Sequence, residues 1–191
     1  MMKRIATLLL TMTLAACSVG KVGAPQTLYD LGSDDRAAAS LAARKPIALS
    51  FSSVPVLTGT GMIWRVGDSA SPKAYTQARW SAAPADLVKQ RLTERLLRQG
   101  PVLADGAPGL PHLRVTLARF EQVFAADGAS SSAQVTLQAV LLQDGQVVSQ
   151  KLVQRSAPAV TQDAEGGARA LRQDTDDAAD DLAAWLAGAL H

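Results

Sequence analysis

Alternating apolar and polar residues along the chain predict a series of β-strands. Ile47, Leu49 and Phe51 alternate with small side chains, which is typical of a half-buried strand, and Pro55 closes the segment. Six further segments have strand-like alternation or a β-rich composition: 27–32, 62–66, 74–80, 112–124, 133–143 and 146–157. We expect these segments to form one sheet.

One of the predicted strands changes phase along its length. Leu113, Val115 and Leu117 fall on one face of the segment 112–124, but the next large apolar residue is Phe120, which breaks the alternation. An extra residue in one strand of a pair has this effect. The sequence therefore predicts a β-bulge or bend near Arg119.

The strongest turn signal lies between the last two predicted strands. Asp144 and Gly145 form a two-residue connection of the kind that favours a tight β-hairpin. Val135, Leu137 and Ala139 form one row on the first strand. The side chains of the second strand that lie opposite this row are either Val148, Gln150 and Leu152 or Val147, Ser149 and Lys151.

Two segments have helical periodicity instead. In 81–100, Val88, Leu92 and Leu96 recur every four residues, with Leu97 beside them, and Ser81 is the expected N-cap. Other features agree with a helix that ends in a turn: Pro84 and Asp86 in the first turn, Gly100 at the end, and Lys89, Arg91, Glu94 and Arg98 on the remaining faces. We expect this helix to lie on the sheet.

The second helical segment is the Ala-rich stretch 166–191. Leu171, Ala178, Leu182, Trp185 and Ala189 follow helical spacing on one side. The other side carries aspartates at 174, 176, 177, 180 and 181. We interpret them as a solvated face and not as a cation site, because a continuous helix lacks the glycine turn and alternating oxygen ligands of calcium loops.

The order of strands, helix, strands and helix predicts an α+β fold. We expect a single mixed or antiparallel β-sheet with two main helices packed on one face. The length of about 175 residues after the N-terminal segment suits one hydrophobic core, so 27–191 is expected to be a single domain.

The first 16 residues have the layout of a secretory signal peptide. Lys3 and Arg4 precede the apolar run Ile5–Leu14, which is too short for a membrane span, and small residues follow. Leu14-Ala15-Ala16-Cys17 resembles the lipobox of bacterial lipoproteins, in which the cysteine is acylated and becomes the first residue. Ordinary cleavage after Ala16 is the alternative.

Lipidation at Cys17 would change several other inferences. Residues 17–26 would be the lipidated cysteine and a flexible tether of small residues. Among lipoproteins, an aspartate after the cysteine favours the inner membrane, so Ser18 favours the outer membrane. More than one acyl chain on Cys17 would give firm anchoring and leave no free thiol.

The charge balance after cleavage gives no support to nucleic acid as a partner. The chain has 19 basic and 17 acidic residues, and loss of Lys3 and Arg4 leaves 17 of each. Cys17 is the only cysteine, which excludes an intramolecular disulfide. Aromatic residues are 4% of the chain, which argues against a stacking surface for bases.

Enzymatic motifs are scarce. His112 and His191 lie outside any metal-type cluster, and the sequence has no G-x-S-x-G elbow, phosphate loop or G-x-G-x-x-G motif. Ser130, Ser131 and Ser132 form a turn cluster. We expect no enzyme activity, no cofactor and no metal. A lipid-handling enzyme would need His112 close to a serine and a carboxylate in one cleft.

Several stretches together carry a family resemblance. "MIWR" at 62–65 and "ARWSAAPADL" at 78–87 are the most distinctive, and "LYDLG", "IALSFSSVP", "RFEQVF" and "LLQDGQVVSQ" extend the match over nearly the whole mature chain. The chain resembles the auxiliary lipoproteins of ABC-type transport systems that work with MCE proteins (PqiC-like), which include the lipoprotein of the paraquat-inducible intermembrane lipid-transport system. The first strand is shorter than is usual in that family.

The resemblance implies a non-enzymatic periplasmic component of a transport system. Its partners would be an inner-membrane ABC permease with its ATPase and an MCE-domain protein that bridges the periplasm. The outer membrane would hold the anchor, a homo-oligomer is also compatible with the family, and the cargo would be phospholipid or another hydrophobic molecule.

The aromatic and arginine residues of the distinctive stretch form our interface hypothesis. Trp64, Arg65, Tyr75 and Arg79 are of the types that anchor protein interfaces. Trp80 is expected in the core, which leaves Arg79 exposed or paired on the opposite side. An alternative function is an outer-membrane assembly lipoprotein that binds a β-barrel or a lipopolysaccharide-handling partner.

Overall fold

The computed structural model describes residues 25–37, 41–104 and 108–190. The predicted signal peptide, Cys17, the predicted tether as far as residue 24 and His191 lie outside this part of the chain. The elements are β1 (Thr27–Tyr29), β2 (Ile47–Ser53), η1 (Pro55–Leu57), β3 (Gly61–Val66), β4 (Lys73–Trp80), α2 (Pro84–Leu97), β5 (Val102–Ala104), β6 (His112–Phe124), β7 (Ser131–Gln143), β8 (Gln146–Arg155) and α3 (Ala164–Ala189).

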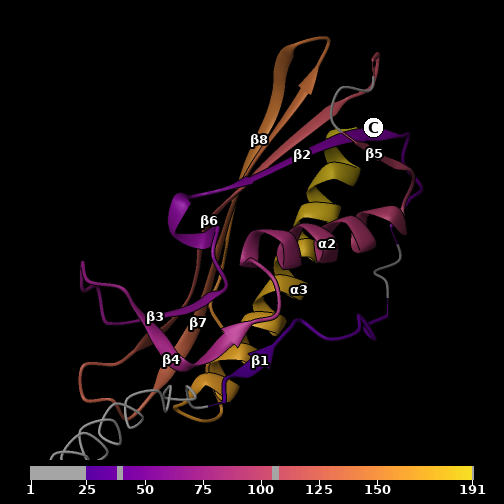
Figure 1. The fold of residues 1–191 in the computed structure, drawn as a ribbon. Coiled ribbons are helices and arrows are strands. Elements are labelled where there is room, and N and C mark those ends of the chain that lie inside the picture. The colour runs from indigo at the N-terminus through magenta and orange to yellow at the C-terminus, as the bar shows by residue number, and fades with distance from the viewer. Residues whose placement is uncertain (1–24, 38–40, 105–107, 191) are drawn as a thin grey trace, which may run out of the picture.

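The described strands form one mixed sheet with β6 at its centre (Figure 1). On one side, β6 pairs antiparallel with β7 along its length, and β7 pairs with β8. On the other side, the first half of β6 pairs parallel with β2 and its last three residues pair parallel with β3. Beyond them lie β5 next to β2, and β4 and β1 next to β3.

Both helices pack on the same face of the sheet, as Figure 1 shows. α3 runs along β7 and β8, and α2 crosses α3 over β2. The predicted α+β class with two helices on one face is therefore confirmed. None of the helices in the described ranges has the length and hydropathy of a membrane-spanning segment.

The core lies between the sheet and the helices. Alternate residues of β6 and β7 are buried there, among them Leu113, Leu117 and Leu137, and they meet Leu171 and Leu182 of α3. Each buried side chain of this size contributes about 1.5–3 kcal/mol to folding. Helix and sheet thus stabilise one another through a single apolar layer.

The predicted phase change in β6 is a real irregularity. The register with β7 shifts between Leu117 and Arg119. As a result Phe120 returns to the core, where its ring lies 5.2 Å from that of Trp80. Trp80 is buried, as expected from its place at the strand end, and Arg79 is exposed.

The hairpin between β7 and β8 is also confirmed. Asp144 and Gly145 both have positive φ angles, of 50° and 77°, as a type I′ turn requires. Ala139 pairs with Lys151 and Leu141 with Ser149. Of the two predicted alternatives, the row that contains Ser149 and Lys151 therefore lies opposite the buried row of β7.

The start of α2 differs from the prediction. The helix begins at Pro84, and its N-cap is Ala83 without a side-chain cap. Ser81 is not the cap because its backbone N–H donates to the carbonyl of Tyr29, which continues the pairing of β4 with β1. At the other end the helix stops at Leu97, and the side chain of Leu97 is half exposed.

The polar face of α2 is partly buried, contrary to the prediction. Arg91 is 2% exposed and donates to the carbonyls of Leu31 and Gly32 at 2.8 and 2.6 Å. It also forms an ion pair with Asp176 of α3. The arginine therefore joins α2, α3 and the segment after β1.

The interpretation of the α3 aspartates as a solvated face is wrong. Asp174 and Asp176 are buried, and the other three aspartates of the group are half-buried. Arg95 pairs with Asp180 at 2.6 Å and Arg36 with Asp177 at 2.7 Å. The reason is that α2 carries arginines four residues apart at 91 and 95, opposite aspartates four residues apart at 176 and 180.

One short strand, β5, is not predicted by the sequence pattern. β5 pairs parallel with β2 over Ile47–Leu49, so four strands and not three separate the two helices in the described part of the chain. Three residues are too few to show an alternation. Gly100, just before β5, has a φ of 156°, and a Cβ there would clash with the carbonyl oxygen of Arg44. The absence of a side chain at Gly100 lets the chain after α2 pack closely against the backbone of Arg44.

Candidate functional site

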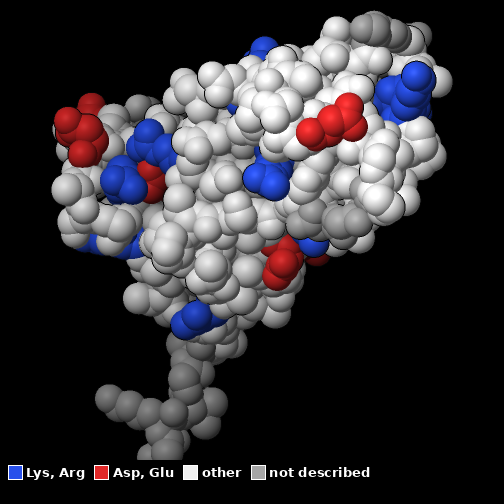
Figure 2. Space-filling view, turned by 90° about the horizontal axis from the view of Figure 1, so that it is seen from above, with Lys and Arg blue, Asp and Glu red and all other residues white. Residues whose placement is uncertain are grey.

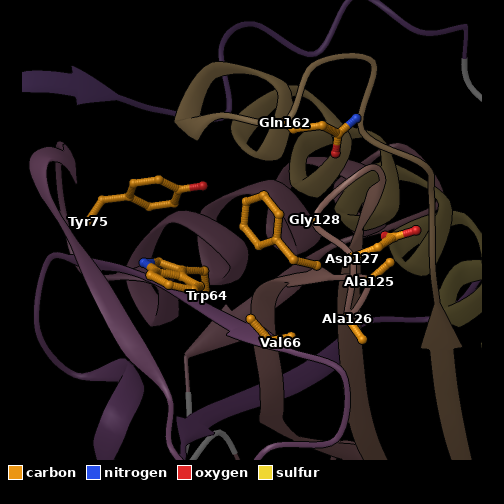
Figure 3. Close-up of a pocket in the computed structure, with 9 residues that line it drawn as sticks. Trp64, Val66, Tyr75, Ala125, Ala126, Asp127, Gly128 and Gln162 are labelled. Carbon is orange, nitrogen blue, oxygen red and sulfur yellow. The ribbon is translucent and has the colours of Figure 1, made fainter.

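An apolar cleft of about 450 Å³ lies where the end of β6 meets β3, β4 and the start of α3. Trp64 comes from β3, Tyr75 from β4 and Phe124 from the end of β6. Figure 3 shows Trp64 and Tyr75 on one side of the cleft, Ala125 and Asp127 on the other, and Gln162 along its edge. Two of the four interface candidates therefore line one cleft.

Three aromatic rings form the wall of the cleft. The rings of Trp64 and Phe124 meet edge to face with centroids 5.6 Å apart, and the Tyr75 ring lies 6.1 Å from Trp64. The ammonium group of Lys73 lies 5.2 Å from the centroid of the Trp64 ring. Val66, at the rim, is 41% exposed. The cleft is apolar inside and carries a positive charge beside it.

A chain of hydrogen bonds fixes the position of the aromatic wall. The Tyr75 hydroxyl donates to Gln122 Oε1 at 2.9 Å, and Gln122 Nε2 donates to Ser131 Oγ at 2.8 Å. Ser131 Oγ donates in turn to Gln162 Oε1 at 2.6 Å. Gln122 is fully buried, so this polar chain passes through the core and returns to the cleft at Gln162.

Tyr75 stays a neutral hydrogen-bond donor in this position. Burial, and after it the negative charge of Asp163, raises the pKa of the Tyr75 phenol to about 12. At neutral pH its hydroxyl therefore keeps the proton that it shares with Gln122.

Two glycines make the cleft possible. Gly128 has a φ of 70° in the turn that follows β6 and lines the cleft. Gly167, in the first turns of α3, lies against Gln122, and a Cβ there would clash with Gln122 Oε1. The absence of a side chain at Gly167 lets the helix approach the buried amide.

The other two interface candidates lie outside the cleft. Arg65 donates from Nε to Glu121 Oε2 at 2.7 Å and from Nη1 to the carbonyl of Ser69 at 2.8 Å. Glu121 is almost fully buried and also pairs with Arg119 at 2.5 Å. Arg79 donates to Gln26 Oε1 at 2.7 Å, next to β1. Both arginines thus have internal partners.

Sequence reasoning missed Phe124 and Gln162, which line the cleft, and Gln122, which holds Tyr75 in place. Phe124 stands out in the sequence only as part of the phase change in β6. A buried glutamine has no sequence signature, because its partners, Tyr75 of β4 and Ser131 of β7, come from other strands, and Gln162 joins the network only through Ser131.

A serine and a histidine also meet, at the opposite end of β6 from the cleft. Ser50 Oγ and His112 Nε2 are 2.5 Å apart across the parallel pair β2 and β6. This is one part of the arrangement that a hydrolase would need. The cleft formed by Trp64, Tyr75 and Phe124 contains neither residue.

On the face shown in Figure 2, charged side chains of both signs are present. Figure 2 shows Lys and Arg, and Asp and Glu, as single residues or small mixed groups separated by uncharged surface on the face in view. Among the described residues, no three His, Cys, Asp or Glu side chains gather in a way that could hold a metal ion. Asp176, Asp177 and Asp180 of α3 pair with arginines instead.

Solved structures share the fold of this chain. A crystal structure of a Xanthomonas campestris protein of the DUF330 family matches with a TM-score of 0.73 at 18% identity, over 85% of this chain and 96% of that one. The two chains share a fold. A second crystal structure, of an uncharacterized protein, matches with a TM-score of 0.66 at 14% identity, over 85% and 99% of the two chains.

Other matches are weaker. A minor lipoprotein from Acinetobacter baumannii has a TM-score of 0.44 at 14% identity, over 76% of this chain and 94% of that one, which is too weak a likeness to support an argument. No protein-family model and no curated protein sequence matches the chain. The comparisons therefore establish the fold, and the role must be argued from the site and the sequence.

Proposed function

We propose that this protein is a non-enzymatic lipoprotein, anchored through Cys17 in the outer membrane with its folded domain in the periplasm. The observation that carries this proposal is the position of Cys17. The only cysteine of the chain follows Leu14-Ala15-Ala16, directly after an apolar segment of signal-peptide type. Two or more acyl chains on that sulfur would hold the domain firmly at the membrane surface.

We further propose that the domain is the auxiliary component of an ABC and MCE transport system for phospholipid or other hydrophobic cargo. The stretch "ARWSAAPADL", which carries the family resemblance, spans the end of β4 and the start of α2. The fold shared with the DUF330 protein is compatible with this assignment. The partners would be the permease and ATPase of the inner membrane and the MCE-domain protein. The MCE-domain protein would contact the end of the sheet that β3 and β4 form.

The anchor is tested by labelling cells that express the full chain with radioactive palmitate. We expect label on the wild-type protein in the outer-membrane fraction and loss of the label in Cys17→Ser. Ser18→Ala is the matched control and should keep both the label and the location. An unlabelled wild-type protein with an unmodified N-terminus would contradict the proposal.

The transport role is tested by affinity purification of the wild-type protein after chemical crosslinking in cells. We expect the MCE-domain protein, with the permease and the ATPase, to be recovered in a stable ratio. Recovery of a β-barrel or a lipopolysaccharide-handling protein in their place would support the alternative function of an assembly lipoprotein and contradict this one.

A further inference from the structure

The aromatic cleft lies at the end of the sheet from which the chain leaves toward Cys17. Gln26 Nε2 donates to the carbonyl of Thr76 at 3.2 Å, one residue from Tyr75 of the cleft wall. Directly after Gln26, β1 pairs with the end of β4. The described part of the chain therefore begins beside the cleft.

The length of chain beyond this point limits the distance to the membrane. Eight peptide units separate Pro25 from Cys17, and a fully extended chain of that length spans at most about 29 Å. If Cys17 is acylated, the cleft is confined to a thin layer above the lipid headgroups. Lipid is then the most concentrated apolar material within its reach.

The chemistry of the cleft suits one alkyl chain below a polar headgroup. Its volume of about 450 Å³ lies within the range of small-ligand pockets, roughly 300–1,000 Å³. The interior presents aromatic edges and faces, together with the exposed side chain of Val66. Asp127 lines the cleft with a carboxylate, and the ammonium group of Lys73 lies outside the lining, 5.2 Å from the centroid of the Trp64 ring. These two charges of opposite sign suit the two charges of a zwitterionic headgroup.

We infer that the cleft between Trp64, Tyr75 and Phe124 binds one acyl chain of a membrane phospholipid. The inference rests on the proposed function, because the anchor at Cys17 brings the cleft to the lipid. It deepens that function: the protein itself contacts the lipid, and a protein partner meets the rim formed by Trp64 and the neighbouring strands.

The test is site-specific photocrosslinking in cells that make the full chain and grow with radioactive phosphate. The photoreactive residue p-benzoylphenylalanine replaces Phe124 in one variant and Tyr75 in another, since both positions already hold aromatic rings in the cleft. Leu152 and Val160 are the control positions, because both are exposed apolar residues outside the cleft. Each adduct is identified by mass spectrometry after digestion.

We expect a radioactive adduct with the mass of a phospholipid at positions 124 and 75. We expect no such adduct at the two control positions. An equal adduct at Leu152 or Val160 would show general contact with the bilayer and overturn the inference. An adduct with a protein or with a lipid of another class in place of phospholipid, or no adduct in folded variants, would overturn it as well.

The same sample separates this inference from the proposed function. The mass of the N-terminal peptide reports whether Cys17 carries acyl chains. An acylated Cys17 without an adduct in the cleft contradicts the inference alone. An unmodified N-terminus contradicts the anchor, whatever is found in the cleft.

Discussion

Gln122 determines where three other side chains lie. Its amide accepts from Tyr75 and donates to Ser131, which holds Gln162 at the edge of the cleft. A buried amide without these partners would cost about 1–3 kcal/mol for each unmade hydrogen bond. The alternation in β6 suggested a strand residue at this position. Its two partners come from β4 and β7, and Gln162 is reached through Ser131, so the sequence could not reveal this network.

The contact between Gly167 and Gln122 gives a first prediction. We expect Gly167→Ala to destabilise the protein by about 2 kcal/mol, because the new methyl group would displace the buried amide and overpack the core. Gly188→Ala, in the same helix with open space around it, is the matched control and should be neutral or stabilising. Urea unfolding of both variants measures the difference. Equal stability of the two variants would contradict the packing described.

Asp174 gives a prediction about pH. Burial raises the pKa of this carboxyl from 3.8 to about 6, although the backbone N–H of Ala157 and the charge of Arg155 act in the opposite direction. Since the pKa is higher in the folded state than in the unfolded state, folding is favoured at low pH, and this contribution is lost as the pH rises from about 4 to about 6.

Asp174→Asn should therefore stabilise the protein at pH 8, by about 1–2 kcal/mol, and change little at pH 4. The asparagine oxygen can still accept from Ala157 without a buried charge. Asp68→Asn, on an exposed turn, is the control. Thermal unfolding at both pH values checks the prediction, and a variant that is less stable at pH 8 would contradict it.

At the scale of elements, the two helices are joined by charges as well as by apolar contacts. Arg91 and Arg95 of α2 reach Asp176, Asp180 and the segment before β2. Helical periodicity correctly predicted both helices and their apolar faces. It did not predict that the charged faces of α2 and α3 would also be buried, because the sequence does not show that these two faces pack against each other.

Removal of Arg91 tests this junction. We expect Arg91→Ala to cost about 3–5 kcal/mol, because it leaves the buried carboxylate of Asp176 without its closest partner and two backbone carbonyls without a donor. Arg169→Ala removes an exposed pair with Glu165 and should change stability by less than about 0.5 kcal/mol. Similar losses in the two variants, measured by urea unfolding, would contradict the buried role of Arg91.

The turn chemistry was more predictable than the helix boundary. Asp144 and Gly145 suit positive φ angles, and the hairpin forms where these residues occur. The start of α2 was mispredicted, since Ser81 has the right side chain for a cap but its backbone belongs to the pairing of β1 with β4. A local signal is reliable only where no distant strand competes for the same backbone group.

For the whole molecule, the fold class followed from the sequence but the order of the sheet did not. β6 pairs in parallel with both β2 and β3, which meet different halves of the same strand. Such pairings join residues far apart in the chain, and no periodicity encodes them. These pairings bring β3 and β4 to the end of β6 and so form the cleft. The separate sequence segments do not predict it.

The same arrangement relates the cleft to the proposed anchor. Strand β1 lies beside the end of β4, so Gln26, near the start of the described chain, lies next to the strand that carries Tyr75. In the proposed function, one end of the sheet therefore meets the membrane, the lipid and the transport partner, while the helices and the charged junction between them stabilise the domain.

The most direct test of the proposed role is the dissociation constant between the full-length protein in detergent and the purified MCE-domain protein that the proposed function gives it as a partner. We expect a stable complex that weakens by about tenfold or more in Trp64→Ala, as for an aromatic interface anchor. Leu152→Ala, an exposed apolar residue on β8, should bind like the wild type. The absence of a complex with the wild-type protein, or equal affinity of folded Trp64→Ala and wild type, would contradict the account.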